Sequence, residues 1–250
     1  MAKRNKYDDV LPEKTLYFDI ETMPCVALVW RPGYNIFVSS EAVLRPSWAC
    51  LIQYKWKNED KVHILSLTRD ELLAGDDKHI WEAFIPVYNS ANLVVTQNGK
   101  RFDVPWLQYR AMVHKLPSPL EQPQVDIKEQ WARKFASPSN KLDWMGNTLF
   151  GQGKDPMSFG DWLAIHHGDM RAYKKMVTYG AKDVTLLQEV HKRCFPYLPR
   201  PPLVSPNMCP HCGSDKMYKN GTRISSMGRK QRQLCLKCGT ASHYFIERWN

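Results

Sequence analysis

The sequence lacks any hydrophobic run long enough to cross a membrane. No stretch of its 250 residues reaches even 18 uncharged apolar residues, whereas a spanning helix needs about 20. The opening segment, MAKRNKYDDVLPEK, carries basic residues but no apolar region of a secretory signal behind them. We therefore expect a soluble, cytoplasmic protein with no membrane partner, in the host-cell cytoplasm if a bacteriophage encodes it.

Acidic residues are in short supply relative to basic ones. The chain has 25 Asp and Glu against 35 Lys and Arg, a formal net charge of +10. Such an excess favours an anionic partner, and nucleic acid is the commonest. An anionic membrane surface is the alternative, but no basic amphipathic segment is long enough to lie on a bilayer.

Cysteine is too sparse for a disulfide scaffold, with seven in the whole chain. Three are scattered in apolar surroundings. The others form two CxxC pairs separated by 22 residues: Cys209, Cys212, Cys235 and Cys238. This spacing predicts one tetrahedral Zn²⁺ ion whose four thiolates leave no open position, so its role is structural. Redox pairs, free thiols and an iron–sulfur cluster are the alternatives.

A proline-rich segment divides the chain. CFPYLPRPPLVSP, residues 194–206, has five prolines and reads as a semi-rigid linker. We expect an N-terminal tail at 1–13, an α/β domain at 14–194, the linker at 195–206 and a zinc ribbon at 207–250. About forty residues cannot build a core unaided, so the metal would supply most of the folding free energy of the ribbon.

The segment before the linker shows an α/β pattern. Apolar and β-branched runs predict strands at 15–20, 49–56, 61–67, 92–96 and 124–127. Helical spacing predicts two helices between them, one with a face of Trp81, Phe84, Ile85 and Tyr88, the other with a face of Phe102, Trp106, Tyr109 and Val113. Residues 128–193 are expected to be helical, with a bend at Gly180 in the last helix.

Two carboxylates lie at the end of the first expected strand, in LYFDIETMP. Residues i and i+2 of a strand face the same side, about 6–7 Å apart, so Asp19 and Glu21 share one face. The bland alternative is a pair of solvated surface acids. Because Leu16, Phe18 and Ile20 indicate a buried strand, unpaired acids there would be costly, and a cation between them is the favoured explanation.

Two further acids lie in helical contexts. Asp103 in NGKRFDVP falls in the first turn of a helix that follows a strand end, where α/β sheets place ligands. Stabilisation of the helix dipole is its alternative role. Asp183 in YGAKDVTLLQEV lies beside a buried helix face, with Tyr179 one turn earlier. A surface acid and a packed tyrosine are the alternatives for these two.

The order of these motifs resembles the DEDD superfamily of 3′→5′ exonucleases, which have the RNase H-like fold. The strand motif D-x-E matches Asp19 and Glu21, the N-x-x-x-F-D motif matches residues 98–103, and Y-x-x-x-D matches Tyr179 and Asp183. Thr178 occupies the position where the other subclass carries histidine, so the tyrosine subclass fits better. The resemblance implies an α/β fold with a mixed five-stranded sheet flanked by helices.

The region around KLDWMGNTLFGQGKDP is similar to bacteriophage exonucleases and to the proofreading domains of family B DNA polymerases. This resemblance spans residues 14–194 and favours DNA over RNA as substrate. Because no polymerase domain is attached, proofreading would require a replication or repair protein as partner. The sequence does not indicate an oligomeric state.

Phosphodiester hydrolysis needs an activated water and a stabilised leaving alkoxide, which two divalent ions can supply. Mg²⁺ or Mn²⁺ prefers oxygen ligands such as carboxylates. The resemblance implies that Asp19 bridges both ions, that Glu21 and Asp183 hold the ion that activates water, and that Asp103 serves the second ion. Tyr179 would orient the water, since a phenol is a poor base at neutral pH.

Several residues are candidates for nucleic-acid contact. Asn98 and Lys154 flank the carboxylate motifs, although Lys154 is equally explained as a solvated loop lysine. WRPGYNIF, residues 30–37, either stacks on bases or packs over the sheet. The expected ribbon has seven basic residues between 216 and 237 and no acid there. Its candidate contacts are Lys216, Lys219, Arg223, Arg229, Lys230 and Arg232.

These patterns predict a metal-dependent 3′→5′ exonuclease tethered to a zinc ribbon that aids substrate binding. A structure-specific or RNase H-type endonuclease on the same fold is one alternative, and the need for a free 3′ end discriminates between the two. A non-catalytic nucleic-acid-binding adaptor is another. A non-catalytic adaptor would be expected to have lost the metal-binding carboxylates, and all four are present.

Overall fold

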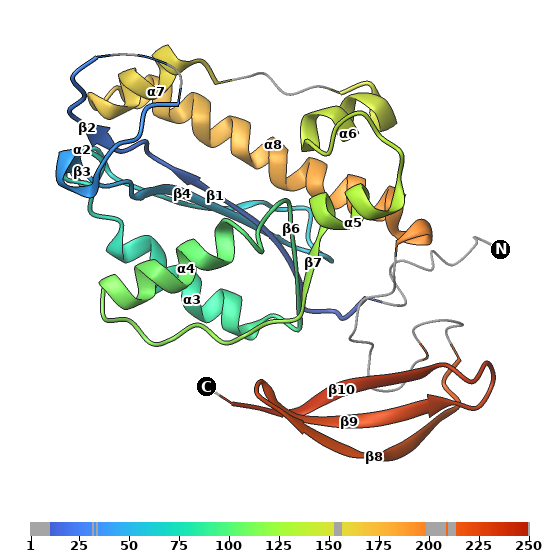
Figure 1. The fold of residues 1–250 in the computed structure, drawn as a ribbon. Coiled ribbons are helices and arrows are strands. Elements are labelled where there is room, and N and C mark those ends of the chain that lie inside the picture. Colours follow the sequence, from blue (N-terminus) through green and yellow to red (C-terminus); the bar gives the residue numbers. More distant parts are fainter. Residues whose placement is uncertain are drawn as a thin grey trace.

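The computed structural model describes residues 11–31, 33, 35–152, 157–198, 209 and 214–249. In this part of the chain a mixed five-stranded sheet is flanked by seven helices, and a separate three-stranded sheet follows (Figure 1). The expected α/β fold with a mixed five-stranded sheet is therefore confirmed. None of the described helices combines the length and the apolar character that crossing a membrane requires.

The five strands are ordered β5-β4-β1-β6-β7. They are β1 (Thr15–Thr22), β4 (Ala49–Trp56), β5 (His63–Ser66), β6 (Leu93–Thr96) and β7 (Gln124–Asp126). β1 is antiparallel to β4 and parallel to β6, β5 is antiparallel to β4, and β7 is parallel to β6. The central place of β1 follows from its composition. Its first residues are apolar or aromatic on both faces of the strand and are buried, as a strand covered on both sides requires.

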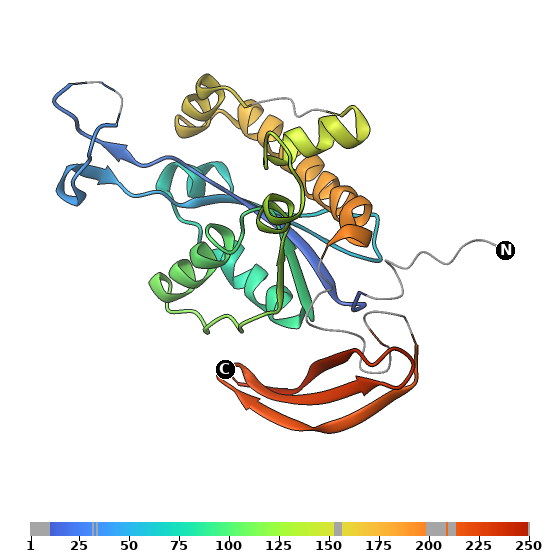
Figure 2. The same cartoon turned by 45° about the vertical axis from the view of Figure 1, so that its right-hand side comes forward.

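Helices cover both faces of this sheet (Figures 1 and 2). α3 (Lys78–Ser90) and α4 (Asp103–Val113) lie on one face, and the long α8 (Met170–Cys194) crosses the other. α6 (Leu142–Phe150) and α7 (Phe159–His166) pack against α8. The remaining helices are α2 (Arg69–Ala74) and α5 (Ile127–Lys134). Two hydrophobic clusters result, which together enclose the sheet.

Two β-structures stand outside this core. β2 (Val26–Ala27) and β3 (Val43–Arg45), with a short 3-10 helix at Ser40–Ala42, form a projecting hairpin (Figure 2). Trp30 and Phe37 in this hairpin are exposed, so these two aromatic side chains do not pack over the sheet. The C-terminal sheet consists of β8 (Met217–Ser225), β9 (Gly228–Cys235) and β10 (Ala241–Arg248), with β9 in the middle.

The core of the α/β domain includes residues that precede β1 and residues that follow α8. Leu11 is buried in the second cluster, although it precedes β1. Phe195 and Leu198 are buried in the same cluster, and Phe195–Tyr197 form a 3-10 helix after α8. The beginning of the proline-rich segment therefore packs on the domain, as far as Leu198.

The predicted face of α4 is wrong. Tyr109 and Val113 are exposed, whereas Leu107 and Ala111 are buried. The stripe that faces the core runs from Asp103 through these residues at intervals of four, one position beyond the aromatic stripe. The aromatic residues Phe102, Trp106 and Tyr109 instead make tilted and edge-on ring contacts with one another along the helix. Orientation of Asp103 toward the sheet thus decides which side of α4 is buried.

The bend expected at Gly180 is absent, since α8 is one continuous helix of 25 residues. The glycine instead allows close approach to β4. A Cβ at this position would lie 2.2 Å from Oε1 of Gln53, a buried side chain whose Nε2 donates to the carbonyl of Val177 at 2.9 Å. Because Gln53 is buried and held by this hydrogen bond, a side chain larger than that of glycine would force α8 or Gln53 to move.

Replacement of Gly180 by alanine is expected to destabilise the protein. Overpacking against Gln53 costs about 1–3 kcal/mol, which exceeds the gain in helix propensity of about 1 kcal/mol. In a Gln53→Ala background the same replacement should instead stabilise, because only the propensity gain remains. Urea unfolding of the four proteins measures this reversal of sign. Stabilisation by Gly180→Ala in both backgrounds would refute the proposed contact.

His191 on α8 is a buried histidine that joins the helix to β1. Its Nδ1 lies 2.8 Å from the hydroxyl oxygen of Tyr17. Burial lowers the pKa of His191 to about 3. Between this value and the ordinary histidine pKa of about 6.5, the unfolded chain binds a proton that the folded chain does not. The contribution of His191 to stability is therefore complete above pH 6.5 and declines as the pH falls.

Acidification is expected to reveal this group. Below about pH 6.5 the free energy of unfolding should fall by about 1.4 kcal/mol per pH unit on account of His191 alone. Urea unfolding of the wild type and of His191→Gln at about pH 7.5 and about pH 5 isolates this part. The variant should lose about 2 kcal/mol less than the wild type on acidification. Equal acid sensitivity of the two proteins would contradict the assignment.

Candidate active site and cysteine cluster

Strand β1 presents its acids toward α8. Leu16, Phe18 and Ile20 pack in the first hydrophobic cluster, while Tyr17 packs in the second, which contains the buried apolar residues of the C-terminal half of α8. Alternation along the strand then places Asp19 and Glu21 on the same face as Tyr17. Both acids are partly exposed, in contrast to the fully buried residues before them. The buried half of β1 thus fixes the direction of its acidic half.

The acidic end of β1 extends beyond its parallel neighbour. β6 pairs with β1 only as far as Tyr17, whereas β4 pairs along the whole strand. The backbone N–H of Ile20 consequently has no strand partner on the β6 side. It donates instead to Oδ1 of Asp103 at 3.0 Å. The first residue of α4 therefore completes the edge of the sheet and brings its carboxylate beside the acids of β1.

Helix α8 supplies the fourth acid. Carboxylate oxygens of Asp19, Glu21 and Asp183 all lie within 4.8 Å of one another. The alignment follows from the contact of Tyr17 with His191: eight residues of helix span about 12 Å and four of strand about 13 Å. Asp183 is therefore opposite Glu21. Tyr179, half-buried, lies one turn earlier on the same helix.

Burial and mutual repulsion dominate the electrostatics of this site. Burial raises the pKa of Asp103 well above its usual range, and the charge of Asp19 raises it further, with a smaller effect from Glu21. Hydrogen bonds from backbone N–H groups, including that of Ile20, act in the opposite direction. Several carboxylates in so small a volume favour an added cation. The hard oxygen donors fit Mg²⁺ or Mn²⁺.

The loop before Asp103 is built around an aspartate that the sequence analysis did not single out. Asp126 is buried, and its carboxylate accepts from the backbone N–H of Asn98 at 3.0 Å and of Lys100 at 3.2 Å. It also caps α5 through the N–H of Glu129 at 3.2 Å. The signal was present in QVDI, where an aspartate follows a strand and precedes a helix.

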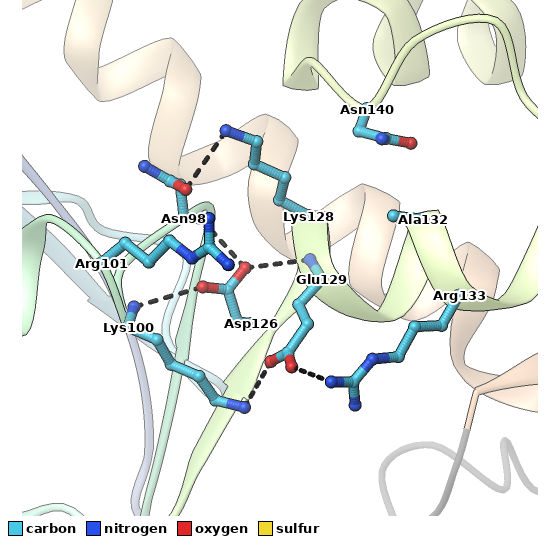
Figure 3. Close-up of a pocket in the computed structure, with 9 residues that line it drawn as sticks. All are labelled: Asn98, Lys100, Arg101, Asp126, Lys128, Glu129, Ala132, Arg133 and Asn140. Atoms are coloured by element: carbon cyan, nitrogen blue, oxygen red, sulfur yellow. Dashed lines mark hydrogen bonds and ion pairs between the residues drawn. The ribbon is translucent and has the colours of Figure 1, made fainter.

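Asn98 and Lys154 are the two predicted nucleic-acid contacts near the carboxylate motifs, and the structure describes only the first. Asn98 has a positive φ of 71° and accepts a hydrogen bond from Nζ of Lys128 at 3.2 Å. It therefore lies on the loop that leads to Asp103. Lys154 lies outside the described residues. Nearby, Lys100, Arg101 and Lys128 gather on the same loop and on α5, which the sequence analysis did not anticipate (Figure 3).

Basic residues of the C-terminal sheet are mostly exposed. Lys216, Lys219, Arg223, Arg229 and Arg232 are exposed, and Lys230 is half-buried. Lys230 lies over the ring of Phe245 at 4.5 Å. Burial lowers its pKa, and Arg223, its partner in the register of β8 and β9, lowers it further. Two cations opposed across a ladder repel each other, so this surface favours an anion.

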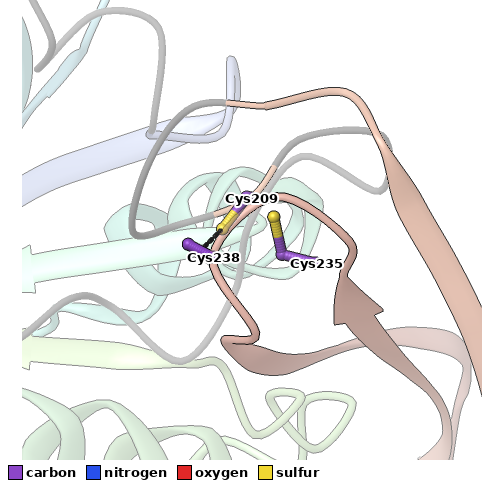
Figure 4. A group of neighbouring side chains, drawn as sticks. All are labelled: Cys209, Cys235 and Cys238. Carbon is purple, nitrogen blue, oxygen red and sulfur yellow. Dashed lines mark hydrogen bonds between the residues drawn. The ribbon is translucent and has the colours of Figure 1, made fainter.

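Three cysteines of the C-terminal segment converge (Figure 4). The sulfur atoms of Cys209, Cys235 and Cys238 lie within 4.8 Å of one another. Cys235 Sγ accepts from the backbone N–H of Lys237 at 3.4 Å, and Gly239 has a positive φ of 72° that closes the turn. Thiolates so arranged fit Zn²⁺. Cys212, the expected fourth ligand, lies outside the described residues.

The C-terminal sheet contacts the α/β domain through Arg248. Its Nη1 donates to the carbonyl of Ala91 at 3.3 Å and to Oε1 of Gln122. Ala91 lies two residues before β6, and Gln122 lies two residues before β7. Both are therefore at the N-terminal edge of the parallel strands. The carboxylates lie at the other end, where β1 terminates. The two features therefore occupy opposite ends of the sheet.

Comparisons with known proteins agree with this architecture. Residues 16–195 match the model of the RNase H superfamily. Among solved structures, a family B DNA polymerase from the hyperthermophilic archaeon Pyrobaculum calidifontis is similar, with a TM-score of 0.53 and 16% identity. The similarity covers 74% of this chain and 25% of the polymerase chain, and it shows a shared fold.

A search of curated proteins finds no match to the sequence. The superfamily match extends over the α/β domain, from the second residue of β1 to the residue after α8. This chain belongs to the RNase H superfamily.

Proposed function

We propose that the protein is a metal-dependent 3′→5′ exonuclease of the tyrosine DEDD type. The observation that carries the proposal is the convergence of acids from three separate segments at the end of β1: Asp19 and Glu21 of the strand, Asp103 of α4 and Asp183 of α8. So many acids in a partly buried site destabilise the fold unless they serve a ligand. Membership of the RNase H superfamily agrees with a nuclease.

The chemistry assigns a task to each side chain. Asp19, Glu21 and Asp183 would hold two Mg²⁺ or Mn²⁺ ions, which when bound lower the pKa of water and stabilise the leaving alkoxide. The N–H of Ile20 donates to Oδ1 of Asp103. This bond would fix the orientation of the carboxylate of Asp103 toward the same ions. The hydroxyl of Tyr179 would donate a hydrogen bond that orients the attacking water.

The C-terminal segment is proposed as a zinc ribbon, with Cys212 as fourth ligand beside Cys209, Cys235 and Cys238. Its cationic strands would hold nucleic acid by its phosphates. Because the ribbon contacts the domain at the edge opposite the carboxylates, it would retain the substrate without touching the cleaved bond. Retention raises the local concentration of strand ends at the site.

The preference for DNA, and a replication or repair protein as partner, belong to the same proposal. Their support is the similarity to a family B DNA polymerase, whose chain is four times as long as the matched region. The proposed organisation is a tail at 1–13, the exonuclease domain at 14–194, a linker at 195–206 and the ribbon at 207–250. The burial of Leu198 extends the domain slightly into this linker.

Removal of one central carboxylate tests the catalytic assignment. The Asp19→Asn variant keeps the size of the side chain but removes its charge, so hydrolysis of a 5′-labelled single-stranded oligonucleotide with Mg²⁺ or Mn²⁺ should fall by at least about 10³-fold. The matched control is Asp70→Asn, which alters an exposed acid in the first turn of α2.

The products identify the type of nuclease. A ladder that shortens from the 3′ end, with circular single strands left intact, supports the exonuclease. Cleavage of circles would establish the endonuclease alternative instead. Undiminished activity of Asp19→Asn would exclude the proposed site altogether.

Loss of one cysteine tests the zinc ribbon. Purified wild type should contain one zinc per chain by atomic absorption, and Cys235→Ser should contain none, because three thiolates hold the ion far more weakly than four. The variant should also bind oligonucleotides more weakly, while its rate at saturating substrate stays near that of the wild type. Cys25→Ser, an exposed cysteine outside the cluster, is the control. One equivalent of zinc in Cys235→Ser would disprove the assignment.

A further inference from the structure

A basic pocket lies beside the loop that carries Asp103. It has a volume of about 350 Å³ and is formed by the 98–101 loop, α5 and Asn140 (Figure 3). Its charged lining consists of Lys100, Arg101, Asp126, Lys128, Glu129 and Arg133. Four cations and two anions give this lining a net charge of +2. The question is which of these charges remain available to a ligand.

The carboxylate of Asp126 does not neutralise the cations. It accepts hydrogen bonds from the backbone N–H groups of Asn98, Lys100 and Glu129, at 3.0, 3.2 and 3.2 Å. These bonds satisfy the acid and occupy the start of α5 at the same time. An anion entering the pocket would therefore meet side-chain cations rather than the free end of a helix.

Glu129 forms ion pairs with two of the four cations. Its two carboxylate oxygens pair with Nζ of Lys100 and with Nη2 of Arg133, each at 2.5 Å. Figure 3 shows these two side chains converging on Glu129. The charge of Arg101 helps to lower the pKa of Glu129, after the larger effects of Lys100 and Arg133, but Arg101 forms no ion pair with it among the residues that the structure describes. Lys128 donates only to the neutral amide of Asn98, at 3.2 Å.

Arg101 has no acidic partner among the described residues. Its backbone N–H donates to the carbonyl of Asn98 at 3.1 Å, while its guanidinium forms no ion pair in the described part of the chain. Only Phe102 separates it in the chain from Asp103, whose carboxylate joins the acids of β1. The two cations of the pocket that form no ion pair with any described residue, Arg101 and Lys128, therefore lie on the loop that leads to Asp103 and in contact with that loop.

We propose that this pocket is a phosphate subsite for the substrate strand, where Arg101 and Lys128 hold backbone phosphates next to the nucleotide being removed. A guanidinium binds phosphate oxygens with two parallel hydrogen bonds, and an ammonium contributes a point charge. The inference rests on the proposed exonuclease function and adds a binding site to it. An open pocket with two such groups suits a continuous strand, which can pass through it.

Binding measurements with matched variants test the subsite. Fluorescence anisotropy of a labelled single-stranded DNA oligonucleotide is recorded without added divalent ions, so that no hydrolysis occurs, between about 50 and 200 mM salt. Arg101→Ala and Lys128→Ala should each weaken binding about tenfold and reduce the slope of log K against log salt by about 0.7. Glu129→Gln should tighten binding, because it releases Lys100 and Arg133.

The control is Lys134→Ala. It removes an equal charge from the last turn of α5, where the side chain is exposed and does not line the pocket. It should change affinity by less than twofold. A substrate with a single phosphate, thymidine 5′-p-nitrophenyl phosphate, provides a second readout. Its KM should be unchanged by Arg101→Ala, whereas the KM for oligonucleotides should rise.

The outcomes separate this inference from the proposed function. Wild-type affinity and salt slope in Arg101→Ala and Lys128→Ala would overturn the subsite, and so would equal weakening by Lys134→Ala. Either result leaves the exonuclease intact if Asp19→Asn still abolishes hydrolysis. Hydrolysis that survives Asp19→Asn would remove the proposed function, whatever the pocket binds.

Discussion

The close packing of α8 on strands β1 and β4 is the contact on which the site depends. Three pairs define it: Gly180 against Gln53, His191 against Tyr17, and Met176 against Cys50, whose sulfur atoms lie 3.6 Å apart. A helix held at three points along its length cannot slide or rotate relative to the strands. Asp183 is consequently delivered to the acids of β1 by residues that have no chemical role themselves.

The architecture also explains how a sheet tolerates acids near its centre. β6 ends early, so the last part of β1 has a free backbone edge, and Asp103 fills it with a carboxylate that accepts the N–H of Ile20. The arrangement completes the hydrogen bonding of the strand at the cost of a buried charge close to Asp19. Such strain is tolerated where a ligand relieves it, which links the fold directly to the proposed metal site.

Much of this organisation could be predicted from the sequence, because it depends on local pattern. Apolar alternation located β1, and β4 has the predicted bounds, 49–56. Acid spacing placed Asp19 and Glu21 on one face. The buried side of α4 could not be predicted, because it follows from a contact between Asp103 and a distant strand. Gly180 was misread for the same reason: its close neighbour, Gln53, is far away in the chain.

The zinc cluster and the basic pocket show the same contrast. The spacing of two CxxC motifs predicts that their sulfur atoms converge on one ion, and the three of these sulfurs in the described residues lie together. The pocket arises only when the 98–101 loop folds over Asp126 toward α5, which brings Arg101 and Lys128 near each other. No periodicity or motif in the sequence predicts this pocket. It becomes visible only when the ion pairs of Glu129 show which charges remain free.

Divalent-ion binding tests the central claim most directly, since the claim is that acids of β1 and α8 form one site. Calorimetric titration with Mn²⁺, which thiolates bind poorly, should show binding to the wild type. Asp183→Asn should weaken it by at least about tenfold, while Asp70→Asn should not. Binding of Mn²⁺ to Asp183→Asn with wild-type affinity would contradict the account, because α8 would then contribute nothing to the site.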